Sequence, residues 1–97
     1  MSDAVTENVT VPGRNGLHMV PCSLIAQRAS KFSSQITISK GATNADARNI
    51  FELLGLGAGE GTVLTCQANG EDAAAAIADL VDLFESGFDG HAHRGSS

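Results

Sequence analysis

Polar and apolar residues alternate along three stretches of the chain, a pattern that predicts strands with one buried face each. The three stretches are Ala4–Val11, Ser34–Lys40 and Gly61–Ala68. Their buried faces are expected to carry Val9, Val11, Ile36, Ile38, Leu64 and Cys66. A shorter extended piece is predicted at Gly41–Ala45, directly after the second stretch.

Apolar residues recur every three or four positions in two other stretches, which predicts two amphipathic helices. In the first, Met19–Lys31, the apolar stripe consists of Cys22, Ile25, Ala29 and Phe32. In the second, Glu71–Phe88, one face carries Ala73, Ile77, Leu80, Val81 and Phe84, while Asp79, Asp82 and Glu85 are expected to point outward.

A third, short helix is predicted at Asn49–Leu54 from its end signals. Asn49 is a good N-cap residue, Glu52 occupies the capping-box position and Gly55 suits the C-terminal cap. The element order is then β-α-β-β-α-β-α. Mixed elements in this order predict an α+β sandwich, with helices on one face of the sheet and the other face exposed.

Composition narrows the class of protein. Ninety-seven residues suffice for one domain. A net charge of −5, from 6 Lys and Arg against 11 Asp and Glu, argues against binding to nucleic acid or to a membrane surface. The polar start of the chain, without a signal peptide, and two isolated cysteines fit a reducing cytoplasm. Residues 1–88 are expected to form the domain, and residues 89–97 (DGHAHRGSS) a disordered tail.

One segment carries candidate chemistry, residues 12–32. Pro21 is tolerated in a helix only in the first turn, and taking Met19 as the first helical residue then places His18 at the N-cap. The N–H groups of Met19 and Val20 would then be unpaired at the positive end of the helix dipole. An anion on the His18 ring would be held there, and histidine forms covalent intermediates near neutral pH. The alternative is an exposed histidine without chemistry.

Two cysteines and a histidine pair offer other interpretations. Cys22 lies one helical turn after His18, so the two side chains could form a metal site, or Cys22 a low-pKa thiol. The competing interpretation, which we favour, is that Cys22 and Cys66 are small buried apolar residues. His91 and His93 in the tail are read as part of a disordered segment rather than as a metal site.

The segment from Asn15 to Pro21, which reads N-G-L-H-x-x-P, resembles the active-site segment of HPr, the histidine-containing phosphocarrier of the bacterial sugar phosphotransferase system. The similarity extends without gaps to about Phe88, through Ile36–Ile38, Asn49–Gly57, Gly61–Thr65 and Gly70–Asp72. The resemblance implies an open-faced sandwich, a four-stranded antiparallel sheet with three helices on one face.

The same resemblance implies a function. His18 would accept a phosphoryl group on Nδ1 from enzyme I, charged by phosphoenolpyruvate, and pass it to IIA-type proteins. Met19 and Val20 would bind the phosphate through their N–H groups. The protein would be a monomeric carrier rather than an enzyme, with no cofactor and no metal. The alternative is an HPr-like module that docks on regulatory proteins without efficient phosphoryl transfer.

The active-site segment departs from the family at Val20, where the family normally has an arginine that reaches the phosphate. A charge-assisted contact is lost there. Arg14, four residues before His18, is the cation that is expected to take its place.

Three other positions that the family often makes basic are Gln27, Ser30 and Glu52 here. Their loss weakens electrostatic steering toward acidic partners. Arg28 and Lys31 compensate only in part, because they lie on a different side of the helix.

The second helix also differs from part of the family. Asn49 stands where many relatives have a regulatory serine, and an asparagine keeps the N-cap hydrogen bond but accepts no phosphoryl group. Phe51, Leu54 and Met19 are expected to flank His18 as an apolar docking patch, with partial burial as the alternative for Leu54.

Overall fold

The computed structural model describes residues 4–88. Along the chain lie β1 (Val5–Thr10), α1 (Met19–Ala29), β2 (Gln35–Lys40), β3 (Thr43–Asp46), α2 (Ile50–Gly55), β4 (Val63–Asn69) and α3 (Ala73–Glu85). The predicted element order is therefore confirmed. The expected tail, residues 89–97 with His91 and His93, lies outside the described residues.

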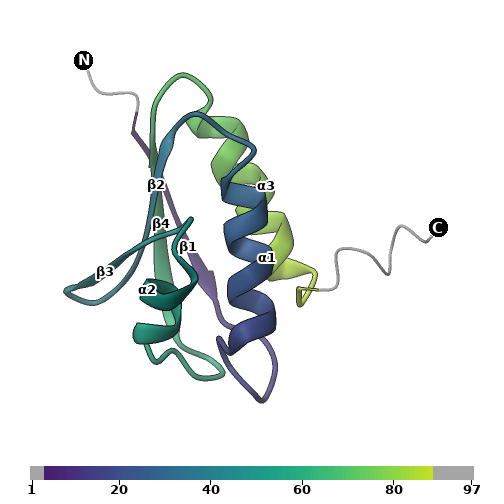
Figure 1. The fold of residues 1–97 in the computed structure, drawn as a ribbon. Helices are drawn as coiled ribbons and strands as arrows, with labels where there is room; N and C mark the ends of the chain where they lie inside the picture. Colours follow the sequence, from purple (N-terminus) through teal and green to yellow (C-terminus); the bar gives the residue numbers. More distant parts are fainter. Residues whose placement is uncertain (1–3, 89–97) are drawn as a thin grey trace.

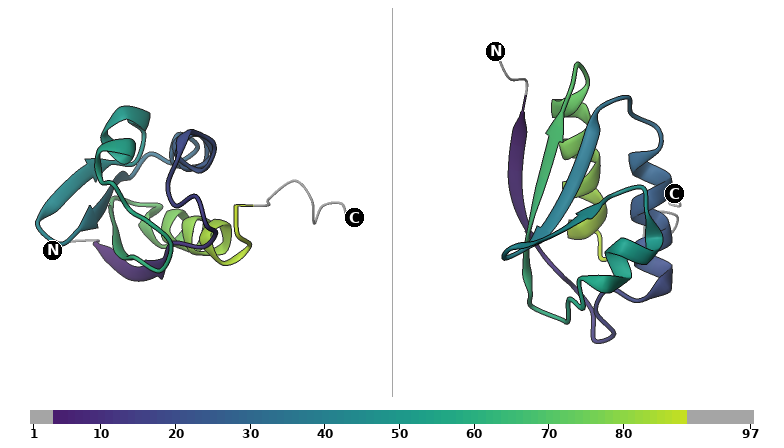
Figure 2. Two further views of the ribbon diagram at one scale, coloured as in Figure 1. Left: turned by 90° about the horizontal axis from the view of Figure 1, so that it is seen from below. Right: turned by 60° about the vertical axis from the view of Figure 1, so that its left-hand side comes forward.

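The four strands form one antiparallel sheet in the order β1-β4-β2-β3. All three helices cover the same face of this sheet, as Figures 1 and 2 show. This is the open-faced sandwich that was expected. Because β4 lies between β1 and β2, the last strand of the chain is central and the first strand, β1, forms an edge.

Alternation along the strands sorts the side chains between core and solvent as predicted. The inner face carries Val9, Val11, Ile36, Ile38, Leu64 and Cys66, all buried. The outer face is polar apart from the exposed Val63 of β4; Thr65, for example, donates a hydrogen bond to Asn8 across the β1–β4 pair at 3.0 Å. Burying an aliphatic side chain of this size contributes about 1.5–3 kcal/mol, so this alternation fixes the register of the sheet.

Helix α1 lies against α3, and the two are joined by an ion pair. Cys22, Ile25 and Ala29 of the predicted stripe are fully buried. The Arg28 guanidinium of α1 contacts the Asp79 carboxylate of α3, with both side chains mostly shielded. The prediction that Asp79 points outward is therefore wrong, because its side of α3 faces α1 rather than solvent.

Helix α3 is shorter than predicted at both ends, and the backbone after Glu85 explains why it ends there. It ends at Glu85, after which Gly87 and Phe88 adopt positive φ values of 73° and 64°. The Phe88 N–H donates to Leu83 O at 3.0 Å and the Gly87 N–H to Phe84 O at 3.1 Å. This is the Schellman pattern, which terminates a helix while pairing its last carbonyl groups.

Helix α2 begins as predicted and ends differently. The Asn49 carboxamide oxygen accepts from the N–H of Phe51 and of Glu52 at 3.0 and 3.1 Å. Gly55 remains helical, and Gly57, with φ of 61°, takes the left-handed position that was expected of Gly55. Lys40 makes this end possible, because its Nζ donates to the carbonyl oxygens of Leu56 and Gly57.

The capping-box prediction for Glu52 is also corrected. Glu52 Oε1 accepts from the N–H of Asp46, at the end of β3, at 2.8 Å. The N–H of Asn49, which a capping box would pair with Glu52, donates instead to Asp46 O at 2.9 Å. Glu52 thus ties α2 to the strand before it.

Asp72, at the N-cap of α3, ties that helix to the turn between α1 and β2. Its Oδ2 accepts from the N–H of Ser33 at 2.8 Å and its Oδ1 from the N–H of Ser34 at 2.9 Å. Both serine hydroxyl groups also donate to this carboxylate. Hydrogen bonding, first from the Ser34 side chain and then from the Ser33 backbone, lowers the pKa of Asp72 from 3.8 to about 2.

Asp72→Asn is expected to lower the urea midpoint of unfolding at pH 7, because an amide offers these donors one oxygen and no charge. A depressed carboxyl pKa stabilises the fold above pH 3.8, and this contribution is lost as the pH falls through about 2. The midpoints of the two proteins should therefore converge between pH 4 and 2. Glu71→Gln, at the neighbouring exposed position, is the control and should show no such convergence.

Candidate functional site

The loop after β1 is held against the chain that follows α2. The N–H of Leu17 donates to Ala58 O at 2.9 Å. A Cβ at Gly16 would lie 2.5 Å from Ala58 O and 2.9 Å from the Gly59 Cα, and Gly16 also has a positive φ of 63°. Only glycine allows this approach of two backbones. The contact therefore fixes the backbone position of Leu17 and of the next residue, His18.

His18 is the N-cap of α1, as predicted, with φ of −91° and ψ of −167°. Its carbonyl oxygen accepts the first bond of the helix, from the N–H of Cys22 at 3.2 Å. Its side chain is exposed and makes no capping hydrogen bond. The imidazole is therefore available to an external group.

Two backbone donors next to His18 are unused. Within the described residues, neither the N–H of Met19 nor that of Val20 donates a hydrogen bond. Pro21, which has no N–H, occupies the third position of the helix and is buried. The free N–H groups and the helix dipole favour a negative charge at this end of α1 by about 0.3–2 kcal/mol.

A pocket of about 200 Å³ opens beside His18. Arg14, His18 and Val20 line it on one side, and Gly87 and Phe88, just after α3, on the other. Arg14 is exposed and, among the described residues, has no ion-pair or hydrogen-bond partner. The structure thus brings the predicted supporting cation to the same pocket as His18.

Apolar side chains are exposed around the start of α1 and on α2, two helices in contact with each other. Met19 is 50% exposed, Val20 59% and Phe51 79%. Leu54 is partly buried and packs against the core. Of the predicted docking patch, Met19 and Phe51 are therefore free to contact a partner, and Leu54 contributes mainly to packing.

Most cations of the described chain are occupied elsewhere. The Arg48 guanidinium donates to the carbonyl oxygens of Phe32 and Ser34, Lys40 to the end of α2, and Arg28 to a carboxylate of α3. Among residues 4–88, Arg14 and Lys31 alone make no ion pair or side-chain hydrogen bond. Arg28 is thus not free to compensate for the missing family cations.

Cys22 is a packing residue rather than a reactive one. It is fully buried beneath the loop, and its thiol donates to Leu17 O at a sulfur distance of 3.7 Å. Burial raises the pKa of the Cys22 thiol, so the low-pKa interpretation is wrong. Cys66 is also buried, and burial raises its pKa to about 12.

The described residues contain no group of three or more His, Cys, Asp or Glu side chains that could hold a metal ion. The His18–Cys22 metal interpretation therefore finds no support among residues 4–88. No helix in this part of the chain is long and apolar enough to cross a membrane.

Two short segments contribute to the site although they were not predicted as site residues. Ala58 and Gly59, which follow α2, position the loop before His18. The signal that was available is the run of glycines from Gly55 to Gly61, which permits close backbone approach. Gly87 and Phe88 line the pocket by tertiary packing, and no local pattern of the sequence indicates it.

Comparisons with known proteins agree with this geometry. The family model described as "PTS HPr component phosphorylation site" matches residues 5–86. The phosphocarrier protein HPr of Haemophilus influenzae is 38% identical over 78 residues, 80% of this chain and 92% of the relative.

Solved structures show the same fold. The crystal structure of HPr-C-His from Thermoanaerobacter tengcongensis superposes with a TM-score of 0.83 at 39% identity, over 87% of this chain and 94% of that one. The catabolite repression protein Crh of Bacillus subtilis superposes with a TM-score of 0.70 at 30% identity, over 86% and 95%.

Cys22 is expected to be unreactive toward a thiol reagent such as DTNB in the native state, because the thiol is buried and its pKa is raised. Both cysteines should react once the chain is unfolded in guanidinium chloride. Cys22→Ala should leave the native reactivity unchanged. Rapid labelling of one thiol in the folded protein that Cys22→Ala removes would restore the reactive-thiol interpretation.

Proposed function

The chain belongs to the HPr family of phosphocarrier proteins, and we propose that it carries a phosphoryl group on His18 between enzyme I and IIA-type proteins of the sugar phosphotransferase system. One observation carries the proposal: an exposed histidine without a capping bond stands beside two unpaired N–H donors at a helix N-terminus. We place this activity in residues 1–88, as a monomer in the cytoplasm.

The transfer step exchanges one phosphorus–nitrogen bond for another. The lone pair of a neutral His18 ring, on Nδ1, attacks the phosphorus of the phosphohistidine of enzyme I, and the donor bond breaks with its electron pair returning to the donor nitrogen. Transfer to a IIA-type protein repeats the exchange with His18 as the donor. Because both bonds are of one kind, the protein needs to stabilise the phosphoryl group only moderately.

The start of α1 supplies that moderate stabilisation. The N–H groups of Met19 and Val20 would donate to phosphate oxygens, and the helix dipole adds a fixed field of the right sign. These donors are held in place by the helix, so they need no reorganisation when charge arrives.

Arg14 is proposed as the cation of the site in place of the family arginine. It lines the same pocket as His18, and no acidic group of the described chain competes for it. A guanidinium hydrogen bond to phosphate is typically worth about 1.5–3 kcal/mol. A side chain that reaches from a loop loses more conformational freedom than one on the helix, which reduces this gain.

Partner docking would use the exposed side chains of Met19 and Phe51 and the exposed part of Leu54. Asn49 has its side chain committed to the N-cap of α2 and has no hydroxyl group, so phosphorylation at that position is not expected.

Incubation with phosphoenolpyruvate and enzyme I is expected to add the mass of one phosphoryl group to the intact protein. The adduct should be labile to acid and stable to alkali, as phosphoramidates are, and His18→Ala should abolish it. Intact-mass spectrometry before and after mild acid treatment measures both properties.

A folded His18→Ala variant, checked by circular dichroism, is the control for that experiment. If neither a cognate nor a foreign enzyme I adds mass, the carrier function is wrong. An HPr-like module that docks on regulatory proteins then remains as the function.

Val20→Arg is expected to increase the rate of phosphorylation by a conventional enzyme I by about 10- to 100-fold, because it restores a charge-assisted contact of about 1.5–3 kcal/mol. Quench-flow measurement of phosphoprotein formation gives the rate. Val20→Gln, of similar length without the charge, should give much less. An unchanged or lower rate with Val20→Arg would mean that the partner is adapted to an apolar site.

Two further variants separate the roles of nearby charges. Arg14→Ala should slow the reaction strongly if Arg14 already supplies the cation. Glu52→Lys added to Val20→Arg should raise the rate further by restoring docking charge, a gain that salt should erode. Since Glu52 accepts from the N–H of Asp46, Glu52→Gln controls for the loss of that bond.

A further inference from the structure

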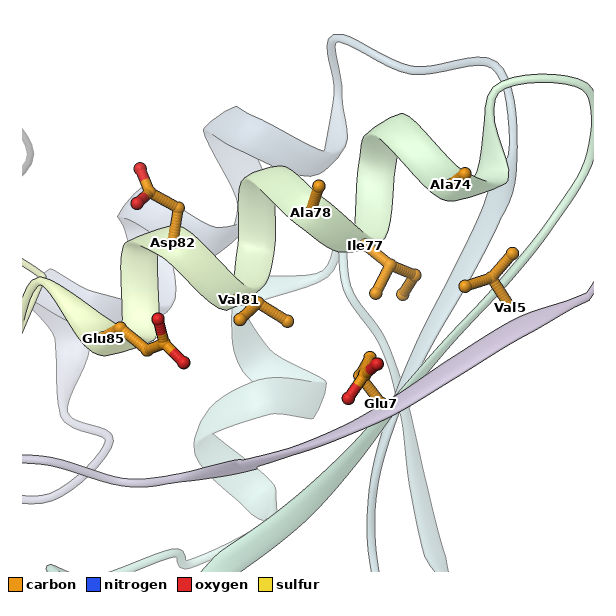
Figure 3. A pocket seen from close by; sticks show the side chains of 8 residues that line it. All are labelled: Val5, Glu7, Ala74, Ile77, Ala78, Val81, Asp82 and Glu85. Carbon is orange, nitrogen blue, oxygen red and sulfur yellow. The ribbon is translucent and has the colours of Figure 1, made fainter.

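A groove runs between the edge strand β1 and helix α3, away from His18. Its apolar lining consists of Val5 on β1 and of Ala74, Ile77, Ala78 and Val81 on α3. Figure 3 shows Val5, Ile77 and Val81 directed into the space between the two elements. The groove has a volume of about 440 Å³. We refer to it as the β1–α3 groove.

Between Ala74 and Val81, the side of α3 that borders this groove lacks the long side chains that usually cover a solvent-facing helix. Ala74 and Ala78 are exposed, and Val81 is partly exposed. An exposed helix face of a soluble protein normally carries charged or polar residues over the apolar layer beneath. Here short side chains leave part of that layer open to another molecule.

Three carboxylates line the groove, and its described lining includes no lysine or arginine. Glu7, Asp82 and Glu85 line it, all three exposed. Glu7 lies on β1, its side chain directed toward α3, whereas the side chain of Asp82 points away from β1 (Figure 3). Within residues 4–88, none of the three side chains forms an ion pair or a hydrogen bond. The groove therefore presents three unpaired negative charges, which favour a partner with positive charge.

We propose that the β1–α3 groove is a second docking surface, which binds a basic amphipathic segment of another protein. Its apolar side chains would lie on Val5, Ala78 and Val81, which are exposed or partly exposed, and its lysine or arginine side chains would pair with Glu7 and Glu85, with Asp82 nearby. The groove shares no lining residue with the pocket at His18. A partner held there leaves His18 accessible, so it binds whether or not His18 carries a phosphoryl group.

A titration of the ¹⁵N-labelled full chain with a synthetic amphipathic peptide of leucine and lysine tests the proposal. At low ionic strength, amide shift changes should concentrate at Val5, Glu7, Ala78 and Val81 and spare His18. Shift changes spread evenly over the acidic surface, or centred on His18, would overturn it. So would self-association of the chain through these residues without peptide, which would make a second copy the occupant.

Charge-neutral variants test the acidic contribution. Glu7→Gln combined with Glu85→Gln should weaken peptide binding by about 3- to 10-fold, which corresponds to about 0.7–1.4 kcal/mol for the two exposed ion pairs together. Asp46→Asn combined with Glu60→Gln changes the net charge equally and lies outside the groove, so it should leave the affinity within about twofold. Equal weakening by both pairs would show nonspecific attraction and refute the groove.

A second pair of variants tests whether the peptide occupies the space of the β1–α3 groove. Ala78→Gln places a long uncharged side chain over the groove and should weaken binding, while Ala75→Gln, at an exposed α3 position outside the groove, should not. Glutamine is a good helix former, so both variants are expected to fold. If Ala78→Gln binds the peptide as tightly as the unchanged protein, the peptide does not occupy the groove.

Discussion

The contact between two backbones at Gly16 and Ala58 sets the geometry of the candidate site. No side chain fits between them, so the loop after β1 has one position, and the hydrogen bond from Leu17 to Ala58 holds it there. His18 follows as the first residue outside that contact and the last before α1. From below, the buried Cys22 thiol donates to Leu17 O. A rigid scaffold thus presents an exposed imidazole at the end of a helix, which is preorganisation achieved without charged side chains.

Most cations of the described residues lie in contacts between elements of the fold, and the surface around His18 is largely apolar. Arg28, Lys40 and Arg48 connect elements of the fold, so three of its cations stabilise the structure. Val20 and Met19 leave the surface at His18 apolar. Under the proposed function, association with enzyme I would rely on apolar contact more than on long-range steering. Such association is slower at low salt and depends less on ionic strength.

The sequence permits prediction of those features that depend on residues close together along the chain. Strand faces follow from alternation, and the N-caps at His18 and Asn49 follow from Pro21 and from the chemistry of asparagine. The errors share another origin. Gly55 stays helical because Lys40, from β2, caps the end of α2, and Asp79 is shielded because α1 brings Arg28 to it. Spacing alone contains no information on such distant partners.

The sheet order also has a consequence for the time course of synthesis. Val5 pairs with Ala68, so β1 leaves the ribosome long before its only neighbour in the sheet exists. At roughly 5–20 residues per second, translation of the intervening chain takes about 3–12 s. During this interval β1 has an unpaired backbone on both sides. Four of its six residues are polar, namely Thr6, Glu7, Asn8 and Thr10. These polar side chains keep the nascent strand soluble until β4 pairs with it.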